Sequence, residues 1–203
     1  PLSRKDALLL TRAPHLVLDG MHIAAAAIGA RTLYLYVHVD AVASVRKALA
    51  ERRAAGIDPP VGIEVTVVEA PDTFVAGEES AAIRHIEGGP ALPRDRTVPP
   101  VAVSGVGKRP TLVNNVETLA HIALIARRGA DWFRSIGDPA DPGTMLVTLS
   151  GALDDEGVVE VPTGVPIADL IDTRELSAVL VGGYHGSWLP ADTFAGTHLS
   201  RTA

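Results

Sequence analysis

Apolar residues recur at the spacing of an α-helix in the stretch that follows Pro14. The positions that fall on one helical face are Leu16, Ile23, Ala27 and Ala30. A threonine hydroxyl can cap the free N–H groups of a first turn, and proline fits within that turn. Thr11 and Pro14 therefore predict the start of this helix. Residues 32–38, Thr-Leu-Tyr-Leu-Tyr-Val-His, then form an unbroken run of strand-forming side chains, which indicates a strand covered on both faces.

A second helix is expected to begin with Asp40 as its cap and to end at Gly56. Its apolar face is formed by Val42, Val45 and Leu49. Residues 63–68 follow as a second run of strand-forming side chains. A strand, a helix and a strand joined by short connections are typical of a βαβ unit in a parallel sheet, so the pattern predicts an α/β fold with a Rossmann-like parallel sheet.

The second half of the chain has a different pattern. Residues 88–110 are rich in Pro, Gly and Arg and predict an extended loop, and a long helix follows it and ends at Gly129. The Gly-, Asp- and Pro-rich run 137–143 predicts a linker between a first domain, residues 1–136, and a second, residues 144–203. The second domain should contain strands at 145–149, 158–162 and 178–181 and a short helix at 167–171, a pattern that suggests a small ubiquitin-like β-grasp module. The aromatic and polar cluster 184–188 is interpreted as a β-grasp loop or as a contact surface.

Composition excludes several classes of function. A net charge of -6 with scattered lysines argues against a nucleic-acid-binding surface, which needs clustered positive charge. The absence of cysteine rules out disulfides, thiolate zinc sites and cysteine-bound iron–sulfur clusters within these residues. No apolar run reaches the length of about 18 residues that a membrane span requires, and no secretory leader is evident. We therefore expect a cytoplasmic protein without direct membrane insertion, which could still associate with a membrane through a complex.

Three segments combine residue types that bind ligands. The first is 74–80, Phe-Val-Ala-Gly-Glu-Glu-Ser, in which a glycine allows close approach to the backbone and two carboxylates can accept ribose hydroxyl bonds. Its alternative interpretation is a solvated, acidic helix start. The second is 110–118, in which Asn114 and Asn115 either cap a helix or offer amides to an anion beside free N–H groups. The third, 104–110, is neither a P-loop nor a complete G-x-G-x-x-G motif.

Taken together, the order and spacing of these segments resemble a known family. A Gly-Glu-Glu-Ser turn, then Glu87-Gly88, a proline-rich loop, Ser-Gly-x-Gly-Lys, and Pro-Thr-x-x-Asn-Asn-Val-Glu-Thr-Leu are similar to the NADH- and FMN-binding subunit of respiratory complex I. The resemblance continues into residues 150–151 and 161–164, which look like the SLBB β-grasp domain of that family. It covers nearly the whole chain.

The resemblance implies a function and a set of site residues. Gly77, Glu78 and Glu79 would form the turn beside the flavin, with Glu79 reaching toward the nicotinamide nucleotide. The flavin's ribityl-phosphate chain would be held by Asn114, Asn115 and Thr118. The cofactors would be FMN and NAD(H), and no side chain would act as a catalytic acid, base or nucleophile. Electrons would pass to an iron–sulfur cluster and a partner subunit.

The chain also departs from the family pattern. Phe74 stands where the family has a tyrosine, and the proline-rich loop lacks the phenylalanine that stacks on adenine. The family's glycine-rich loop and Asn-x-x-Glu segment would precede residue 1, and its four cluster cysteines, which bind a 4Fe-4S cluster, would follow residue 203. We therefore expect a fragment holding a partial FMN/NADH-binding domain. The alternative is a flavin-free binding or assembly module that retains the fold.

Overall fold

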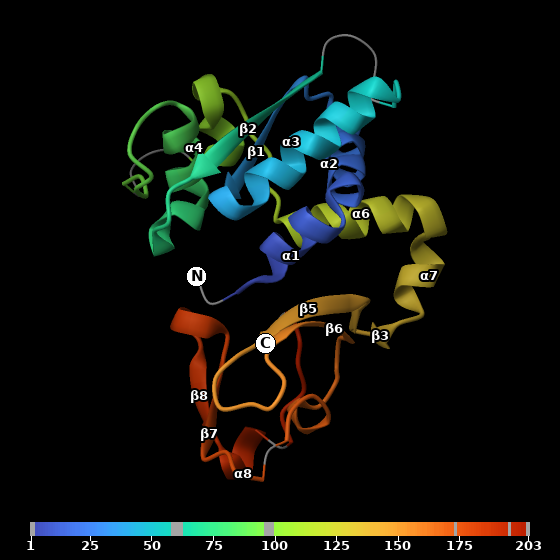
Figure 1. Ribbon diagram of the computed structural model, residues 1–203, viewed down its shortest axis with the longest axis vertical. Helices are drawn as coiled ribbons and strands as arrows, with labels where there is room; N and C mark the ends of the chain where they lie inside the picture. The colour runs from blue at the N-terminus through green and yellow to red at the C-terminus, as the bar shows by residue number, and fades with distance from the viewer. Residues whose placement is uncertain (1–2, 58–62, 96–99, 173, 195, 202–203) are drawn as a thin grey trace. The chain divides into compact units, whose positions relative to one another are not determined.

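The computed structural model describes residues 3–57, 63–95, 100–172, 174–194 and 196–201. The chain divides into two compact units (Figure 1). The first is Ala7–Ala123, and the second comprises the residues from Leu124 onward together with the short N-terminal stretch 3–6. None of the helices in this described part of the chain is long and apolar enough to cross a bilayer.

The first unit is built around the expected βαβ arrangement. Its strands, β1 (Thr32–His38) and β2 (Glu64–Ala70), are parallel and pair in register from Thr32–Glu64 to His38–Ala70. The longer helices of this part of the chain are α1 (Lys5–Arg12), α2 (Pro14–Ile28), α3 (Val39–Ala54), α4 (Glu79–Ile86) and α6 (Val116–Arg128). In Figure 1, α3 runs beside the two paired strands. The α/β fold and the parallel sheet predicted from the sequence are confirmed.

The two faces of β1 pack against different helices. Leu33, Leu35 and Val37 are buried in the core, where they meet apolar side chains of α2, α3 and α6. On the opposite face, Tyr36 packs edge-on against His85 of α4, with 5.8 Å between the ring centroids. Helices thus contact both faces of this strand, as its continuous run of strand-forming residues predicts.

The helix caps differ from those expected. The hydroxyl of Thr11 donates to the carbonyl oxygens of Ala7 and Leu8 within α1, a helix that the apolar pattern did not reveal, and α2 begins at Pro14 without a side-chain cap. At α3, the ring Nδ1 of His38 accepts the Asp40 N–H at 3.5 Å. The predicted caps were therefore wrong, because α1 leads almost directly into α2 and β1 leads directly into α3.

Two contacts join the helices of the first unit. At Gly20, α2 passes so close to α6 that a Cβ atom would lie 1.8 Å from the Leu119 carbonyl oxygen. The guanidinium of Arg52 on α3 bonds the Asp19 carboxylate on α2 at 2.7 Å, and Arg52 is only 5% exposed. Glycine at residue 20 is therefore required by packing rather than by backbone conformation.

The second unit contains paired antiparallel strands. β5 (Thr144–Leu149) pairs with β6 (Gly157–Pro162), and β7 (Ala178–Val181) pairs with β8 (Ser187–Pro190). The other elements are α7 (Ala130–Arg134), β3 (Gly137–Asp138), β4 (Asp141–Pro142), α8 (Ala191–Phe194) and the 3₁₀ turns η3 (Ile167–Asp169) and η4 (Gly183–His185).

The three predicted strands of this unit are present, and the short helix predicted at 167–171 is the 3₁₀ turn η3. The segment interpreted as a loop at 184–188 instead leads into β8, with Trp188 directly opposite Leu180. This strand is short and its residues are mostly exposed, so its apolar pattern is weak. The β-grasp assignment for residues 144–203 stays a prediction.

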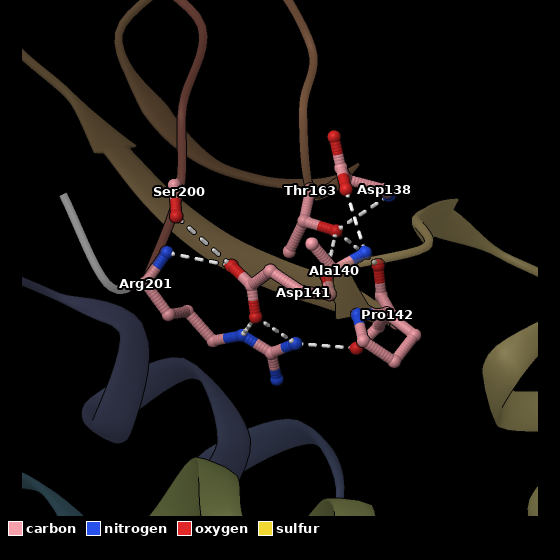
Figure 2. Close-up of polar contacts among 8 residues, drawn as sticks. Asp138, Ala140, Asp141, Pro142, Thr163, Ser200 and Arg201 are labelled. Carbon is pink, nitrogen blue, oxygen red and sulfur yellow. Dashed lines mark hydrogen bonds and ion pairs between the residues drawn. The ribbon is translucent and has the colours of Figure 1, made fainter.

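Residues 137–143 form the β3–β4 hairpin, which is tied into the second unit (Figure 2). The hydroxyl of Thr163 donates to the Asp141 carbonyl oxygen, and Asp138 donates its N–H to Thr163. The Asp141 carboxylate accepts the Ser200 hydroxyl at 3.2 Å and the Arg201 backbone N–H at 2.9 Å. The segment predicted as a linker is therefore a bonded hairpin, and its role as a linker and the domain limits stay predictions.

The close approach of α2 to α6 predicts a large effect of a single methyl group. Gly20→Ala should lower the free energy of unfolding by about 1 to 3 kcal/mol, because the overlap with the Leu119 carbonyl outweighs the better helix propensity of alanine. The measurement is urea unfolding followed by circular dichroism. As a control, Ala26→Gly on the exposed side of α2 should cost at most about 1 kcal/mol. A Gly20→Ala protein as stable as the wild type would contradict the close approach of α2 to α6 at this residue.

The Asp141 cluster predicts a pH dependence of stability. The Arg201 backbone N–H holds the pKa of the Asp141 carboxyl below 3.8, against the opposing effect of burial and with help from the Arg201 guanidinium and the Ser200 hydroxyl. A lowered pKa stabilises the fold above the unfolded-state pKa, and this contribution disappears as pH falls through the folded-state pKa. Asp141→Asn should therefore be less stable than the wild type at pH 7. The free energy of unfolding should fall by only about 1 to 2 kcal/mol, because solvent screens the interaction with the partly exposed Arg201.

Thermal unfolding of both proteins between pH 2 and pH 7 measures this difference. The difference in melting temperature between the two proteins should be largest at neutral pH and should disappear as the pH falls below about 4. A difference that is constant across this range would show that the charge of Asp141 does not stabilise the hairpin.

Candidate functional site

The Gly-Glu-Glu turn lies just beyond the carboxyl end of β2. Residues Phe74–Gly77 form a 3₁₀ turn, η1, which is separated from the end of that strand by only three residues. Phe74 is 49% exposed, and no atom beyond Gly77 and its two chain neighbours lies within 4 Å of the place that a Cβ atom on Gly77 would occupy. Ligands of parallel α/β sheets bind at the carboxyl ends of the strands. The turn is therefore exposed at the edge of the sheet where a ligand is expected.

The two glutamates of the turn have different surroundings. The Glu78 carboxylate caps α4 by accepting the Ala81 N–H at 2.9 Å, and it also accepts the Ser80 hydroxyl. Burial tends to raise the pKa of Glu78, but hydrogen bonds from the Ser80 side chain and backbone and from Ala81 outweigh it, so its pKa lies below 4.5. Glu79 is exposed in the first turn of α4. Both glutamates thus fit the helix-start interpretation, Glu78 as the cap of α4 and Glu79 as an exposed acid in its first turn, and binding of a nucleotide by Glu79 stays a prediction.

The asparagine segment leads into α6. The side-chain oxygen of Asn115 accepts the Glu117 N–H at 3.0 Å, so Asn115 caps the helix that begins at Val116. Its amide nitrogen carries two further donors. Asn114 and Thr118 are both exposed on either side of the cap. Amide donors beside the N-terminal N–H groups of a thirteen-residue helix suit a phosphate.

The Ser-Gly-x-Gly-Lys segment begins at the end of a short helix, α5 (Val101–Ser104), and contains a 3₁₀ turn, η2 (Val106–Lys108), so the prediction of an extended loop is wrong for this part of residues 88–110. The segment leads into the asparagine segment. The hydroxyl of Thr111 accepts the Val106 N–H at 3.0 Å, and Thr111 comes so close to Gly105 that a Cβ there would lie 2.2 Å from this hydroxyl. Gly107 and Lys108 both adopt left-handed conformations, with φ of 61° and 60°. Lys108 is the non-glycine residue with positive φ in the described part of the chain. A left-handed backbone is strained in a residue that has a Cβ atom, and backbone strain is concentrated at functional sites.

A polar network that the sequence did not reveal joins this loop to the turn. The Arg94 guanidinium bonds the Glu87 carboxylate at 2.8 Å and the Ser104 carbonyl at 3.1 Å. The second oxygen of Glu87 accepts the Gly107 N–H at 2.9 Å. Arg94 also donates its backbone N–H to the Ser80 hydroxyl at 2.8 Å. Glu87-Gly88 was a marker of the resemblance, but no spacing in the sequence pairs Glu87 with Arg94.

The donors and acceptors of these segments fit a flavin mononucleotide and a pyridine dinucleotide. The side-chain amides of Asn114 and Asn115, next to the first N–H groups of α6, suit a phosphate, and Gly77 leaves its side of the turn uncovered. The exposed carboxylate of Glu79 can accept ribose hydroxyl bonds. The turn and the asparagine segment stand on different elements, before α4 and before α6. The individual roles of all seven predicted residues stay predictions.

Comparison with known proteins identifies the family. The model of the Nuo51 FMN-binding domain matches residues 1–124. An NADH-quinone oxidoreductase subunit of Rhizobium meliloti is 33% identical over 94% of this chain, and one of Mycobacterium tuberculosis is 37% identical over 85%. The alpha subunit of the NAD-reducing hydrogenase HoxS of Cupriavidus necator is 35% identical over 92%. The chain spans 49%, 40% and 33% of the lengths of these relatives.

Solved structures agree with this assignment. A crystal structure of NAD+-reducing [NiFe]-hydrogenase in the H2-reduced state superposes with a TM-score of 0.89 at 35% identity, covering all of this chain and 36% of that one. The air-oxidised state of the same enzyme type gives a TM-score of 0.84 at 36% identity. The resemblance described from the sequence motifs is confirmed. The chain belongs to the Nuo51 FMN-binding domain family.

Proposed function

We propose that this chain is the flavin- and nucleotide-binding part of an NADH dehydrogenase subunit of the quinone type. The observation that supports it most is the open Gly-Glu-Glu turn beyond the carboxyl end of β2, in a chain whose first 124 residues match an FMN-binding family. Relatives that are NADH-quinone oxidoreductase and NAD-reducing hydrogenase subunits point to NADH as the electron donor.

Each segment has a distinct role in this proposal. Asn114, Asn115 and Thr118 hold the ribityl-phosphate chain of FMN by amide, hydroxyl and helix N–H donors. Gly77 leaves room for the ring system, and Phe74 borders it. Glu78 fixes the turn through its bonds to α4, and Glu79 binds a ribose of the nicotinamide nucleotide. The chemistry that bound FMN supplies is acceptance of a hydride and release of single electrons.

The same proposal names the partners. Because these 203 residues contain no cysteine, a 4Fe-4S cluster that receives the electrons must be held elsewhere in the whole protein or in an iron–sulfur partner subunit. Residues 144–203 serve as the SLBB-like β-grasp domain. We place the protein in the cytoplasm, associated with a membrane through its complex.

Glu79→Gln tests the nucleotide site. Glutamine keeps the shape of the side chain but is a weaker acceptor for ribose hydroxyls, and bonds to a charged group contribute about 1.5 to 3 kcal/mol. The affinity of the full-length protein for NADH should fall about tenfold or more, while its FMN content stays normal. Steady-state NADH oxidation and bound flavin are the measurements. Unchanged KM and kcat would show that Glu79 does not bind the nucleotide.

Asn115→Asp tests the flavin site with the helix cap kept. Aspartate still offers an oxygen to the Glu117 N–H, but it replaces the amide donors with a negative charge that repels phosphate. The dissociation constant for FMN should rise more than tenfold, and the melting temperature of the flavin-free protein should stay unchanged. Fluorescence titration with FMN measures the first quantity. Wild-type FMN affinity in this variant would show that the asparagine segment does not bind the flavin.

A further inference from the structure

The guanidinium of Arg94 forms hydrogen bonds with two different parts of the first unit. One nitrogen bonds the carboxylate of Glu87, just beyond α4, and another bonds the Ser104 carbonyl at the start of the glycine–lysine loop, residues 104–109. Glu87 then bonds the Gly107 N–H of the same loop. The Arg94 side chain is 18% exposed and that of Glu87 35%, so the pair is largely shielded from solvent. The loop is thus held to α4 at two points by one ion pair.

The same residue also reaches the Gly-Glu-Glu turn. The backbone N–H of Arg94 donates to the Ser80 hydroxyl at 2.8 Å, and that hydroxyl donates to the carboxylate of Glu78. Glu78 is the cap of α4 and follows Gly77 directly. A continuous chain of hydrogen bonds therefore runs from the turn through Ser80 and Arg94 to the loop.

The loop in turn positions the asparagine segment. Thr111 accepts the Val106 N–H through its hydroxyl and donates its own N–H to the Val101 carbonyl at 3.1 Å. Asn114 follows only three residues later. Because Thr111 also fills the space beside Gly105, a shift of the loop has to move Thr111 with it. The loop is thus linked to the asparagines through Thr111 and the chain that follows it.

We propose that Arg94, together with Glu87, is a positioning residue that sets the spacing between the nucleotide-binding turn and the flavin-binding segment. This inference rests on the function proposed above. A partly buried ion pair adds little stability beyond what an apolar pair would give, and its planar, two-armed geometry is better suited to fixing a relative position. Loss of that geometry should therefore weaken the binding of both cofactors, although Arg94 has no proposed contact with either.

Arg94→Lys in the full-length protein is the decisive variant. Lysine keeps the charge but lacks the planar fork that reaches Glu87 and the Ser104 carbonyl together. The dissociation constants for FMN and for NADH should each rise about tenfold. This joint loss differs from Glu79→Gln, which should affect NADH alone, and from Asn115→Asp, which should affect FMN first. Loss of affinity for only one cofactor would overturn the positioning role.

Arg52→Lys is the matched control for stability. Arg52 forms another shielded arginine–carboxylate pair, with Asp19, and it lies outside the turn, the loop and the asparagine segment. This variant should lower the melting temperature at least as much as Arg94→Lys while leaving both dissociation constants within about twofold of the wild type. If the two variants lose cofactor affinity equally, Arg94 acts through overall stability and the proposal is wrong.

Trypsin gives a readout that does not depend on bound flavin. The bond after Lys108 lies in the glycine–lysine loop, and cleavage there should be several times faster in flavin-free Arg94→Lys than in flavin-free wild type. Equal cleavage rates would show that Arg94 does not hold the loop. A wild-type protein that binds no FMN would refute the proposed function instead, and the cleavage comparison would still report on the loop.

Discussion

The carboxylate of Glu87 is the point on which the candidate site depends. One oxygen accepts a backbone N–H from the glycine–lysine loop, and the other accepts a guanidinium N–H from Arg94. Arg94 in turn bonds Ser80 beside the cap of α4. The βαβ core places the end of β2 where a ligand is expected, and this one acid connects the turn that follows β2 to the loop that precedes α6. The core thus fixes where the candidate site lies in the sheet, and we propose that the polar network sets the spacing between the turn and the flavin-binding segment.

Much of the fold could be predicted from local pattern. Residues 32–38 became β1 with the expected limits, because seven consecutive strand-forming residues leave little choice of structure. The order of strand, helix and strand then required a parallel pairing, which β1 and β2 show. Among the elements that local pattern missed are α1, which is only eight residues long, the four-residue helix α5 in the predicted extended loop, and β8, which has four residues that are mostly exposed.

The site was predicted as segments, but its connections were not. Glycines, adjacent acids and paired asparagines mark the turn and the start of α6 because their backbone freedom and capping chemistry are local properties. The pairing of Arg94 with Glu87 across seven residues depends on how the loop folds back on α4, and no periodicity encodes that. The different surroundings of Glu78, which caps α4, and of Glu79, which is exposed, likewise required the structure, since both acids fit a helix start.

Hydrogen exchange tests most directly the central claim that two separate segments hold the two nucleotides. The full-length protein is compared without ligand, with FMN, and with FMN and NADH, and exchange is followed by mass spectrometry. FMN should slow exchange mainly in residues 111–118, and NADH should add protection mainly in residues 74–80. Protection by both ligands that leaves these two segments unchanged would contradict the account.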